Sequence, residues 1–381
     1  MRGILTALAL AAVSAAPAAA QTFRLETPAR HLAIMDGATG ILLHCDDCET
    51  PIPPASMSKL MTVLIVAERL QAGRITLDTR FRVSENAWRH GAMSDGSHMF
   101  LELNSEVSVR DLLQGLIIVS ANDACLVLAE GVSGSEEAFA AEMNQRAQAL
   151  GLRSARFRNT TGLPDPDHVI SAADLARLAR HLINTYPDLY RYYSQREFRY
   201  NNHTQENRNP LLGAFAGADG VKTGHTDDSG YGLVGSAVLD GQRRIIVFNG
   251  LRSMAERRSE ASRLMATAFH DFGVSEVAAA GQQIGEAQVR LGSRRTVPLV
   301  AERAIIIGGQ RGVQAGLNAH IVYNGPLPAP IREGDAVARL VVEGPGFQRQ
   351  EFPLVAGRRI GRANWFARAG EGLRLTLFGP S

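Results

Sequence analysis

Lysine is nearly absent from this chain. Of its 40 basic residues, 38 are arginine and two are lysine, Lys59 and Lys222. The 38 acidic residues leave a formal net charge of +2, so the chain lacks the dominant basic face of a nucleic-acid protein, and we expect no such partner. Arginine stays charged at any accessible pH, whereas a buried lysine amine can lose its proton. The positions of the two lysines therefore bear on function.

Cysteine is also scarce, with three residues in the chain. Cys45 and Cys48 have the C-x-x-C spacing of a redox or metal site. No second C-x-x-C and no paired histidines complete a zinc site. A small loop disulfide or two inert thiols are therefore favoured over a redox centre, and Cys125 fits a buried helix position. We expect no metal and no cofactor.

The amino terminus has the features of a secretory signal peptide. Residues 1–20 contain Arg2, an uncharged run rich in alanine and leucine, and three alanines before Gln21. The alternative is an amino-terminal membrane anchor, but the run is short and weakly apolar for a span. We therefore predict cleavage near Gln21 and a location outside the cytoplasm.

The length of 381 residues and the periodicity predict two domains. In the first, residues 21–275, strand-like segments flank a helical block, which predicts an α+β domain whose sheet is made from distant segments. The predicted strands are a hairpin over 30–43 and segments 220–226, 231–239 and 244–249, and the predicted helices are 55–70, 109–129, 135–150, 171–186 and 256–272.

A smaller domain follows. Residues 273–283 are rich in alanine, glycine and glutamine, which predicts a linker, and short alternating runs then predict an all-β domain over 283–357. From 358 to 381, apolar residues recur at steps of mostly three or four with arginines between them. We predict an amphipathic helix that anchors the protein to a membrane surface. The alternative is a tail that packs on its own domain or is disordered.

Ser56 and Lys59 lie three residues apart in a predicted helix, so both side chains project from one face. A serine hydroxyl becomes a good nucleophile when a base takes its proton, and a lysine made neutral by burial can be that base. This S-x-x-K pattern is common, and Ser56 alone could be only a helix cap.

Two further motifs follow in order along the chain. Ser120-Ala121-Asn122 comes at or just after an apolar helical run, and Lys222-Thr223-Gly224 lies in a predicted strand. Singly, Ser120 could bond to its own helix and Lys222 could be a solvated charge. Together, the S-x-x-K, S-x-N and K-T-G motifs match the set of the penicillin-recognising serine acyltransferases. Both lysines of the chain lie in this set.

With their neighbours, these motifs resemble the low-molecular-mass penicillin-binding proteins, which are the serine D-alanyl-D-alanine carboxypeptidases of peptidase family S11. The resemblance covers almost the whole mature chain and is carried by segments 54–62, 120–124, 159–164, 207–209 and 220–226. It implies a penicillin-binding, β-lactamase-like transpeptidase domain, with a sheet flanked by helices, and then a small all-β domain. Cys45-x-x-Cys48 and the glycine-rich tail depart from the family pattern.

The resemblance implies that Ser56 attacks the carbonyl between two D-alanines of a peptidoglycan stem peptide and forms an acyl-enzyme. Lys59 would be the general base, kept neutral by burial and by the nearby charge of Lys222. Ser120 would pass a proton toward the leaving amine, and Asn122 would hold Lys59 and the substrate amide. β-Lactams would acylate the same serine.

The resemblance also implies how the substrate is bound. Lys222 and Thr223 would bind the terminal carboxylate, and Gly224 lets the substrate backbone lie close to the strand. The backbone N–H groups of Ser56 and His225 would form the oxyanion hole. The expected location is the periplasm, with the tail on the surface of the inner membrane.

Three alternatives stay open. A class A β-lactamase would need a Glu-x-x-Leu-Asn pattern between Ser120 and Lys222, and that pattern is absent. An endopeptidase that cuts peptidoglycan cross-links shares the catalytic motifs. A catalytically inactive wall-binding scaffold could share them too, but penicillin would not label its Ser56.

Overall fold

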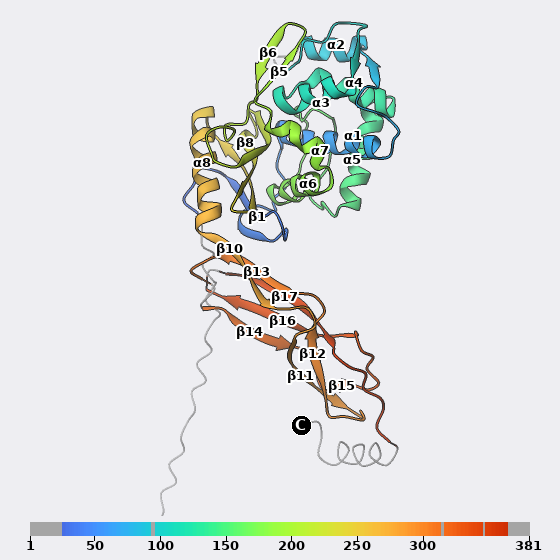
Figure 1. Ribbon diagram of the computed structural model, residues 1–381, viewed down its shortest axis with the longest axis vertical. Coiled ribbons are helices and arrows are strands. Elements are labelled where there is room, and N and C mark those ends of the chain that lie inside the picture. Colours follow the sequence, from blue (N-terminus) through green and yellow to red (C-terminus); the bar gives the residue numbers. More distant parts are fainter. Residues whose placement is uncertain (1–24, 93–95, 314–315, 346, 365–381) are drawn as a thin grey trace, which may run out of the picture.

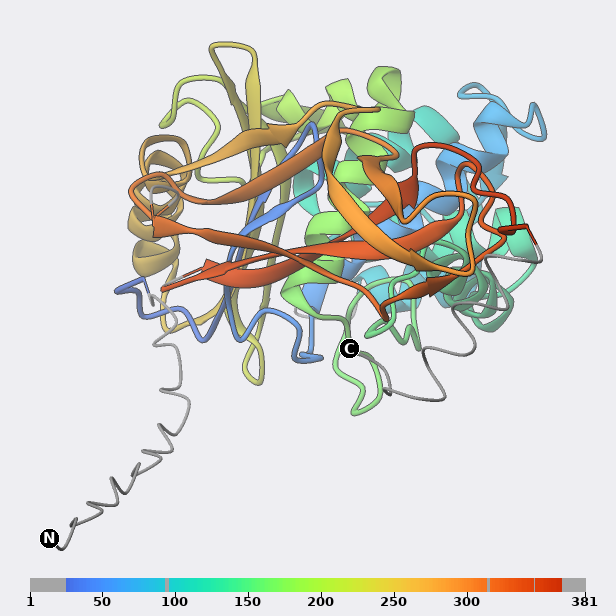
Figure 2. The ribbon, with the colours of Figure 1, turned by 90° about the horizontal axis from the view of Figure 1, so that it is seen from below.

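The computed structural model describes residues 25–92, 96–313, 316–345 and 347–364. The predicted signal peptide and most of the predicted amphipathic tail lie outside these residues. Two parts follow one another along the long axis: an amino-terminal part of helices and strands, and a carboxy-terminal part of strands (Figure 1). Figure 2, seen from below, has the orange and red strands of the second part in front of the first.

An antiparallel five-stranded sheet, in the order β2-β1-β9-β8-β7, forms the centre of the amino-terminal part. β1 pairs with β9, so the two ends of this part lie side by side. The predicted hairpin and the sheet of distant segments are confirmed. The strands are β1 (His31–Asp36), β2 (Leu42–Asp46), β7 (Ala218–Thr226), β8 (Gly230–Leu239) and β9 (Gln242–Leu251).

Alternation along β1 shows that both faces of the sheet are buried. Leu32 and Ile34 belong to the cluster on the face covered by α8 (Met254–His270), which contributes Leu264. Ala33 and Met35 belong to the larger cluster on the other face, which the helical block covers. The sheet therefore lies between two layers of helices, as predicted for this α+β domain.

The helical block is inserted between β2 and β7. Two short antiparallel pairs accompany it, β3 (Arg80–Arg82) with β4 (Glu106–Ser108) and β5 (Glu197–Tyr200) with β6 (His203–Glu206). Its helices are α1 (Lys59–Gln71), α2 (Glu85–Ala92), α3 (Val109–Gln114), α4 (Asn122–Ser133), α5 (Glu136–Ala149), α6 (Ala172–Thr185) and α7 (Pro187–Tyr190), with a 3-10 turn η3 (Arg191–Ser194).

The single helix predicted over 109–129 is wrong, because the chain breaks at Ser120. After α3 comes a π-helical turn, η2 (Gly115–Val119), and α4 begins only at Asn122. Ser120 has a φ of 65°, a left-handed conformation that is uncommon for residues other than glycine. Apolar residues on both sides of the break are buried, so the hydrophobic periodicity continues through it and does not reveal it.

The carboxy-terminal part confirms the all-β prediction. A six-stranded sheet has the order β14-β16-β17-β12-β11-β15, and a second pair joins β10 (Phe272–Ala278) to β13 (Ile305–Gln310). The linker predicted over 273–283 is therefore wrong over most of its length. The other strands are β11 (Gln283–Arg290), β12 (Thr296–Ala301), β14 (Asn318–Val322), β15 (Leu327–Pro328), β16 (Ala336–Gly344) and β17 (Phe347–Ala356).

The two parts touch at the first hairpin. A Cβ atom at Gly308 of β13 would lie 2.6 Å from Ile41 Cγ2 and 2.7 Å from Leu43 Cδ2, so any larger residue would force these side chains to shift. Cys45 in β2 and Cys48 just beyond it form a disulfide, which is one of the two favoured alternatives, and Cys125 is buried in α4 as predicted. In the described part of the chain, no helix is both long and apolar enough to cross a bilayer.

Asp36→Ala is expected to lower the free energy of unfolding by about 3–5 kcal/mol. The Asp36 carboxylate accepts from Arg244 Nη1 at 2.6 Å, and both side chains are at most 5 % exposed, so the substitution leaves a buried guanidinium without its counter-charge. Urea denaturation measures the change. The control is Glu85→Ala, which removes an exposed partner of Arg89 and should change stability by less than about 1 kcal/mol. Equal effects of the two substitutions would contradict this account.

Candidate active site

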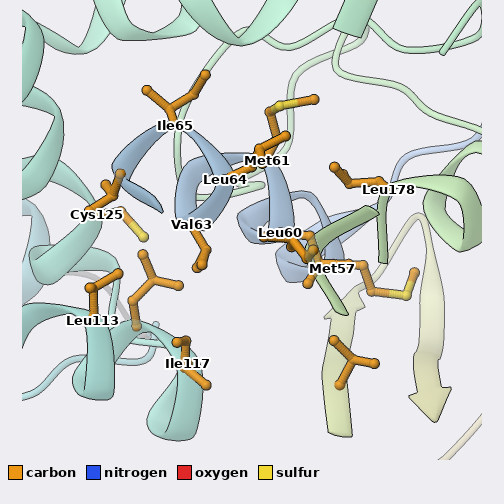
Figure 3. Packing of buried hydrophobic residues seen from close by; sticks show 14 of the residues in the cluster. Met57, Leu60, Met61, Val63, Leu64, Ile65, Leu113, Ile117, Cys125 and Leu178 are labelled. Atoms are coloured by element: carbon orange, nitrogen blue, oxygen red, sulfur yellow. The ribbon is translucent and has the colours of Figure 1, made fainter. Parts of the chain in front are cut away.

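Ser56 and Lys59 lie where the chain enters α1 through a 3-10 turn, η1 (Ala55–Ser58). Apolar side chains around this turn and helix, among them Met57, Leu60 and Val63, anchor it in the larger core (Figure 3). Lys59 Nζ donates to Ser56 Oγ at 2.9 Å, and the Lys59 side chain is fully buried. The structure thus brings the predicted nucleophile and base into direct contact.

Two further acceptors surround the Lys59 amine. It donates to Asn122 Oδ1 at 2.8 Å and to the backbone carbonyl of Thr161. Asn122 opens α4 just after the break at Ser120, and its backbone N–H donates to Ser97 O at 2.7 Å. All three N–H bonds of the ammonium therefore have acceptors, which come from three separate segments of the chain.

The contribution of Thr161 was missed at the level of sequence, where segment 159–164 only supported the family resemblance. The neighbouring Thr160 is held from two sides: its carbonyl accepts from Thr62 Oγ1 at 2.8 Å, and its N–H and hydroxyl donate to Glu136. Gly162, at a φ of 79°, then passes so close to Ala55 O that a Cβ would lie 2.0 Å away. These contacts aim the Thr161 carbonyl at Lys59.

Ser120 lies at the same site with an unused hydroxyl. Its side chain is buried, and Ser120 Oγ has no hydrogen-bond partner among the described residues. The left-handed φ turns the residue out of the helical path between η2 and α4. A buried hydroxyl without a partner is costly unless a ligand or water completes it. Ser120 is therefore available to a bound substrate.

β7 brings the K-T-G motif against η1. A Cβ at Gly224 would lie 2.8 Å from Pro54 O and 3.0 Å from Met57 Cγ, so glycine is required for this approach. Lys222 and Thr223 precede it as buried residues, and Lys222 Nζ donates to Thr223 O at 3.1 Å. The ring of His225 is stacked on Tyr231 with centroids 3.8 Å apart. The group of His225 that is expected to act on the substrate is its backbone N–H, not this ring.

Both lysine amines hold their protons less tightly than usual. Burial lowers the pKa of Lys59 to about 8, and the positive charge of Arg208 acts in the same direction. Burial, and then the charge of Lys59, places the pKa of Lys222 well below 10.5. Burial is the largest cause for Lys59, as expected, but the main cation that acts on its pKa is Arg208 and not the expected Lys222; the charge of Lys59 acts on Lys222 instead.

A cavity of about 1050 Å³ opens at Ser56 and extends away from it past Ser120 and Thr223. One carboxylate, Glu206, is among its walls. Its basic residues are Arg196, Arg208, Arg257 and Arg258. Arg208 belongs to segment 207–209, which supported the family resemblance; the other three were not singled out from the sequence, since 38 arginines give no signal for any one of them. The site can therefore attack a carbonyl and hold an anionic group beside it.

Comparison with protein families decides the assignment. The model described as D-alanyl-D-alanine carboxypeptidase, peptidase S11, matches residues 15–251. The chain belongs to this family. A second model, for the carboxy-terminal domain of penicillin-binding protein 5, matches residues 272–362. The predicted family, fold class and reaction class are confirmed: this chain is a serine-type carboxypeptidase, which displaces the class A β-lactamase alternative.

Relatives of this carboxypeptidase match it nearly from end to end. It is 34% identical over 349 residues to D-alanyl-D-alanine carboxypeptidase DacA of Haemophilus influenzae, covering 91% of this chain and 88% of the relative. It is similar to the crystal structure of penicillin binding protein 5 from the same organism, with a TM-score of 0.75 and 33% identity. This match covers 90% of this chain and 100% of that structure. It is also similar to the crystal structure of the D-alanyl-D-alanine carboxypeptidase DacD from Francisella tularensis, with a TM-score of 0.76 and 29% identity. This match covers 93% of this chain and 98% of that structure.

Acylation of Ser56 is expected to accelerate as the pH rises toward 8. Lys59 can accept the serine proton only when neutral, and its pKa of about 8 leaves it mostly protonated below that pH. The second-order rate of penicillin acylation should rise by about tenfold per pH unit and level off above the pKa. Labelling with a fluorescent penicillin across this range measures it, after correction for free penicillin hydrolysis. A constant rate would contradict Lys59 as the base.

Proposed function

We propose that this carboxypeptidase removes the terminal D-alanine from peptidoglycan stem pentapeptides through an acyl-enzyme on Ser56. The observation that carries the proposal is the contact between Ser56 Oγ and the fully buried Lys59 amine, whose pKa is lowered to about 8. Such an amine can take the serine proton near neutral pH. The shortened peptide lacks the terminal D-alanine, which limits cross-linking.

In the acylation step, Ser56 Oγ bonds to the carbonyl carbon between the two D-alanines and its proton passes to Lys59 Nζ. The C–N bond then breaks, and Ser120 relays a proton to the departing amine. Asn122 holds Lys59 through Oδ1, which leaves its amide nitrogen for the substrate. Water hydrolyses the ester and frees Ser56.

The terminal carboxylate binds at Lys222 and Thr223. Arg257 supports it from α8: Arg257 is largely buried, its Nε has no partner in the described part of the chain, and its Nη1 lies 3.4 Å from Gly224 O. The backbone N–H groups of Ser56 and His225 receive the charge that develops on the carbonyl oxygen. β-Lactams acylate Ser56 in the same arrangement.

The expected location is the periplasm after cleavage of residues 1–20, with the tail from 358 onward on the inner-membrane surface. The last described residues support this, because Arg362 pairs with Gly292, two residues after β11, and the end of β11 pairs with β15, which lies at the end of the molecule far from the amino-terminal part (Figure 1). A tail attached there leaves the active site away from the membrane.

A stem pentapeptide incubated with the enzyme is expected to lose one alanine, as measured by mass spectrometry. Lys59→Arg should abolish this turnover and the labelling of Ser56, because arginine cannot act as a base at neutral pH. The control is Arg69→Lys, an exchange in the opposite direction on the same helix, which should have little effect.

Three other outcomes would contradict the proposal. Comparable acylation in Lys59→Arg would remove the assigned role of Lys59. An unlabelled Ser56 in a folded protein would favour the scaffold alternative. Cleavage of cross-linked muropeptides without loss of alanine from the pentapeptide would favour the endopeptidase.

Truncation after Asn364 is expected to move most of the protein from the membrane fraction to the soluble fraction, with pentapeptide turnover unchanged. This end point keeps Ile360, which is fully buried and pairs with Ile331, so the β domain stays intact. Cell fractionation and a turnover assay on the same samples measure both effects. Membrane association equal to that of the full chain would contradict the anchor.

A further inference from the structure

Glu136 is an acidic residue at the start of α5 that hydrogen-bonds outside its own helix. The helix is capped by Ser135, whose Oγ accepts from Ala138 N at 3.2 Å. Glu137, the next residue, is exposed, and hydrogen bonds from its own backbone N–H and from Ser135 lower its pKa. Glu136 Oε1 instead accepts from Thr160 N at 2.9 Å and from Thr160 Oγ1 at 2.7 Å. One carboxylate oxygen of α5 thus holds both polar donors of a residue in the loop before α6.

Thr160 is held by α1 as well. It is fully buried, and its carbonyl accepts at 2.8 Å from Thr62 Oγ1, one helical turn after Lys59. Among the described residues, the helix side chains that hydrogen-bond the loop over 159–164 are Lys59, Thr62 and Glu136. Lys59 is the group that the loop contacts in the active site. Thr62 and Glu136 are therefore the side chains that fix the loop against the helices.

The carbonyl of Thr161, the next residue in the loop, decides where the lone pair of Lys59 points. A neutral lysine amine has two N–H groups and one lone pair, and it can take the serine proton only if the lone pair faces Ser56 Oγ. Asn122 Oδ1 and Thr161 O accept the two N–H groups, which leaves the lone pair for Ser56. If the Thr161 carbonyl moved away, the amine would be free to donate an N–H to Ser56 Oγ, and its lone pair would face elsewhere.

We propose that Glu136 is a positioning residue for the general base Lys59. By holding Thr160, it keeps the Thr161 carbonyl in the place where that carbonyl orients the lone pair toward Ser56. This rests on the proposed function, in which Lys59 takes the serine proton. Glu136 is not among the described residues that line the cavity at Ser56, so it acts on the reaction through the loop. It also lies outside the three sequence motifs, whose spacing does not indicate it.

The charge of Glu136 gives a second, measurable effect. A nearby carboxylate favours the ammonium form of Lys59 and so raises its pKa, against the lowering by burial. If Glu136 loses its charge, the pKa of Lys59 therefore falls, and the neutral amine is present at lower pH.

Lys59 also interacts with titratable groups on other elements, and two of them are neutral near pH 7. Burial raises the pKa of Cys125 to about 12 and lowers that of His168 to about 4. The charged groups are Asp123 of α4, Arg208 in the cavity wall and Lys222 of β7. None of these groups has a hydrogen bond to Glu136 in the described part of the chain. Substitution of Glu136 therefore changes the charge around Lys59 by that of Glu136 alone.

The test measures the second-order rate of acylation of Ser56 by a fluorescent penicillin from about pH 6 to about pH 9. Glu136→Ala removes the acceptor of both Thr160 donors and is expected to lower the plateau rate about tenfold, because the base is misoriented. Glu136→Gln keeps an oxygen acceptor and should retain the plateau rate within about threefold. Its inflection should lie at lower pH than that of the parent enzyme, because the ammonium form of Lys59 loses a favourable charge.

The matched control is Glu137→Gln, which changes an exposed carboxylate of the same helical turn that has no hydrogen bond to the loop in the described ranges. This variant should keep both the plateau rate and the inflection of the parent enzyme. Urea denaturation checks that each variant is folded. Thr160→Val, which removes one donor and keeps the shape of the side chain, serves if Glu136→Ala does not fold, with an expected loss of about threefold.

Three results would overturn the role of Glu136. They are a folded Glu136→Ala with the parent plateau rate, a Glu136→Gln whose rate falls as far as that of Glu136→Ala, and a Glu136→Gln with the parent inflection. A folded parent enzyme that penicillin does not label, or labels at a rate independent of pH, contradicts the proposed function itself. Labelling of the parent with the expected pH dependence, together with any of the three results, overturns only the assignment of Glu136.

Discussion

The buried ammonium of Lys59 is the interaction on which the arrangement of the site depends. A charge removed from water must find acceptors, and here Ser56, Asn122 and the Thr161 carbonyl provide one for each N–H. They come from η1, the start of α4 and the loop before α6. The hydrogen bonds to this one amine thereby fix the relative positions of the three segments. Burial of Lys59 also lowers the pKa of the amine to about 8, where it can act as a base.

The second constraint is the close approach of β7 to η1. Gly224 has no side chain to hold the strand away from Pro54 and Met57, so the backbone of β7 lies beside η1, the turn that contains Ser56. Lys222 is brought near Lys59 in this way, and the charge of Lys59 makes the charged form of Lys222 less favourable.

Much of this could be predicted from the sequence, and the failures have physical reasons. Hydrophobic periodicity located α5 and α6 nearly to the residue, but it passes unchanged through the break at Ser120, whose left-handed backbone depends on tertiary contacts. β10 was expected to be a linker because its strand character comes from pairing with β13. Thr161 acts through a backbone carbonyl, a group that every residue has. Arg257 is one of 38 arginines.

The sequence by itself determined the chemistry: an S-x-x-K pair, an S-x-N and a K-T-G motif, and a composition that keeps lysine only in two of them. These are properties of side-chain type and spacing, which local sequence records. Tertiary structure alone decided how deeply Lys59 is buried, which carbonyl faces it, and which charges line the cavity at Ser56. Burial and electrostatic environment depend on segments far apart in the chain, and no single segment encodes them.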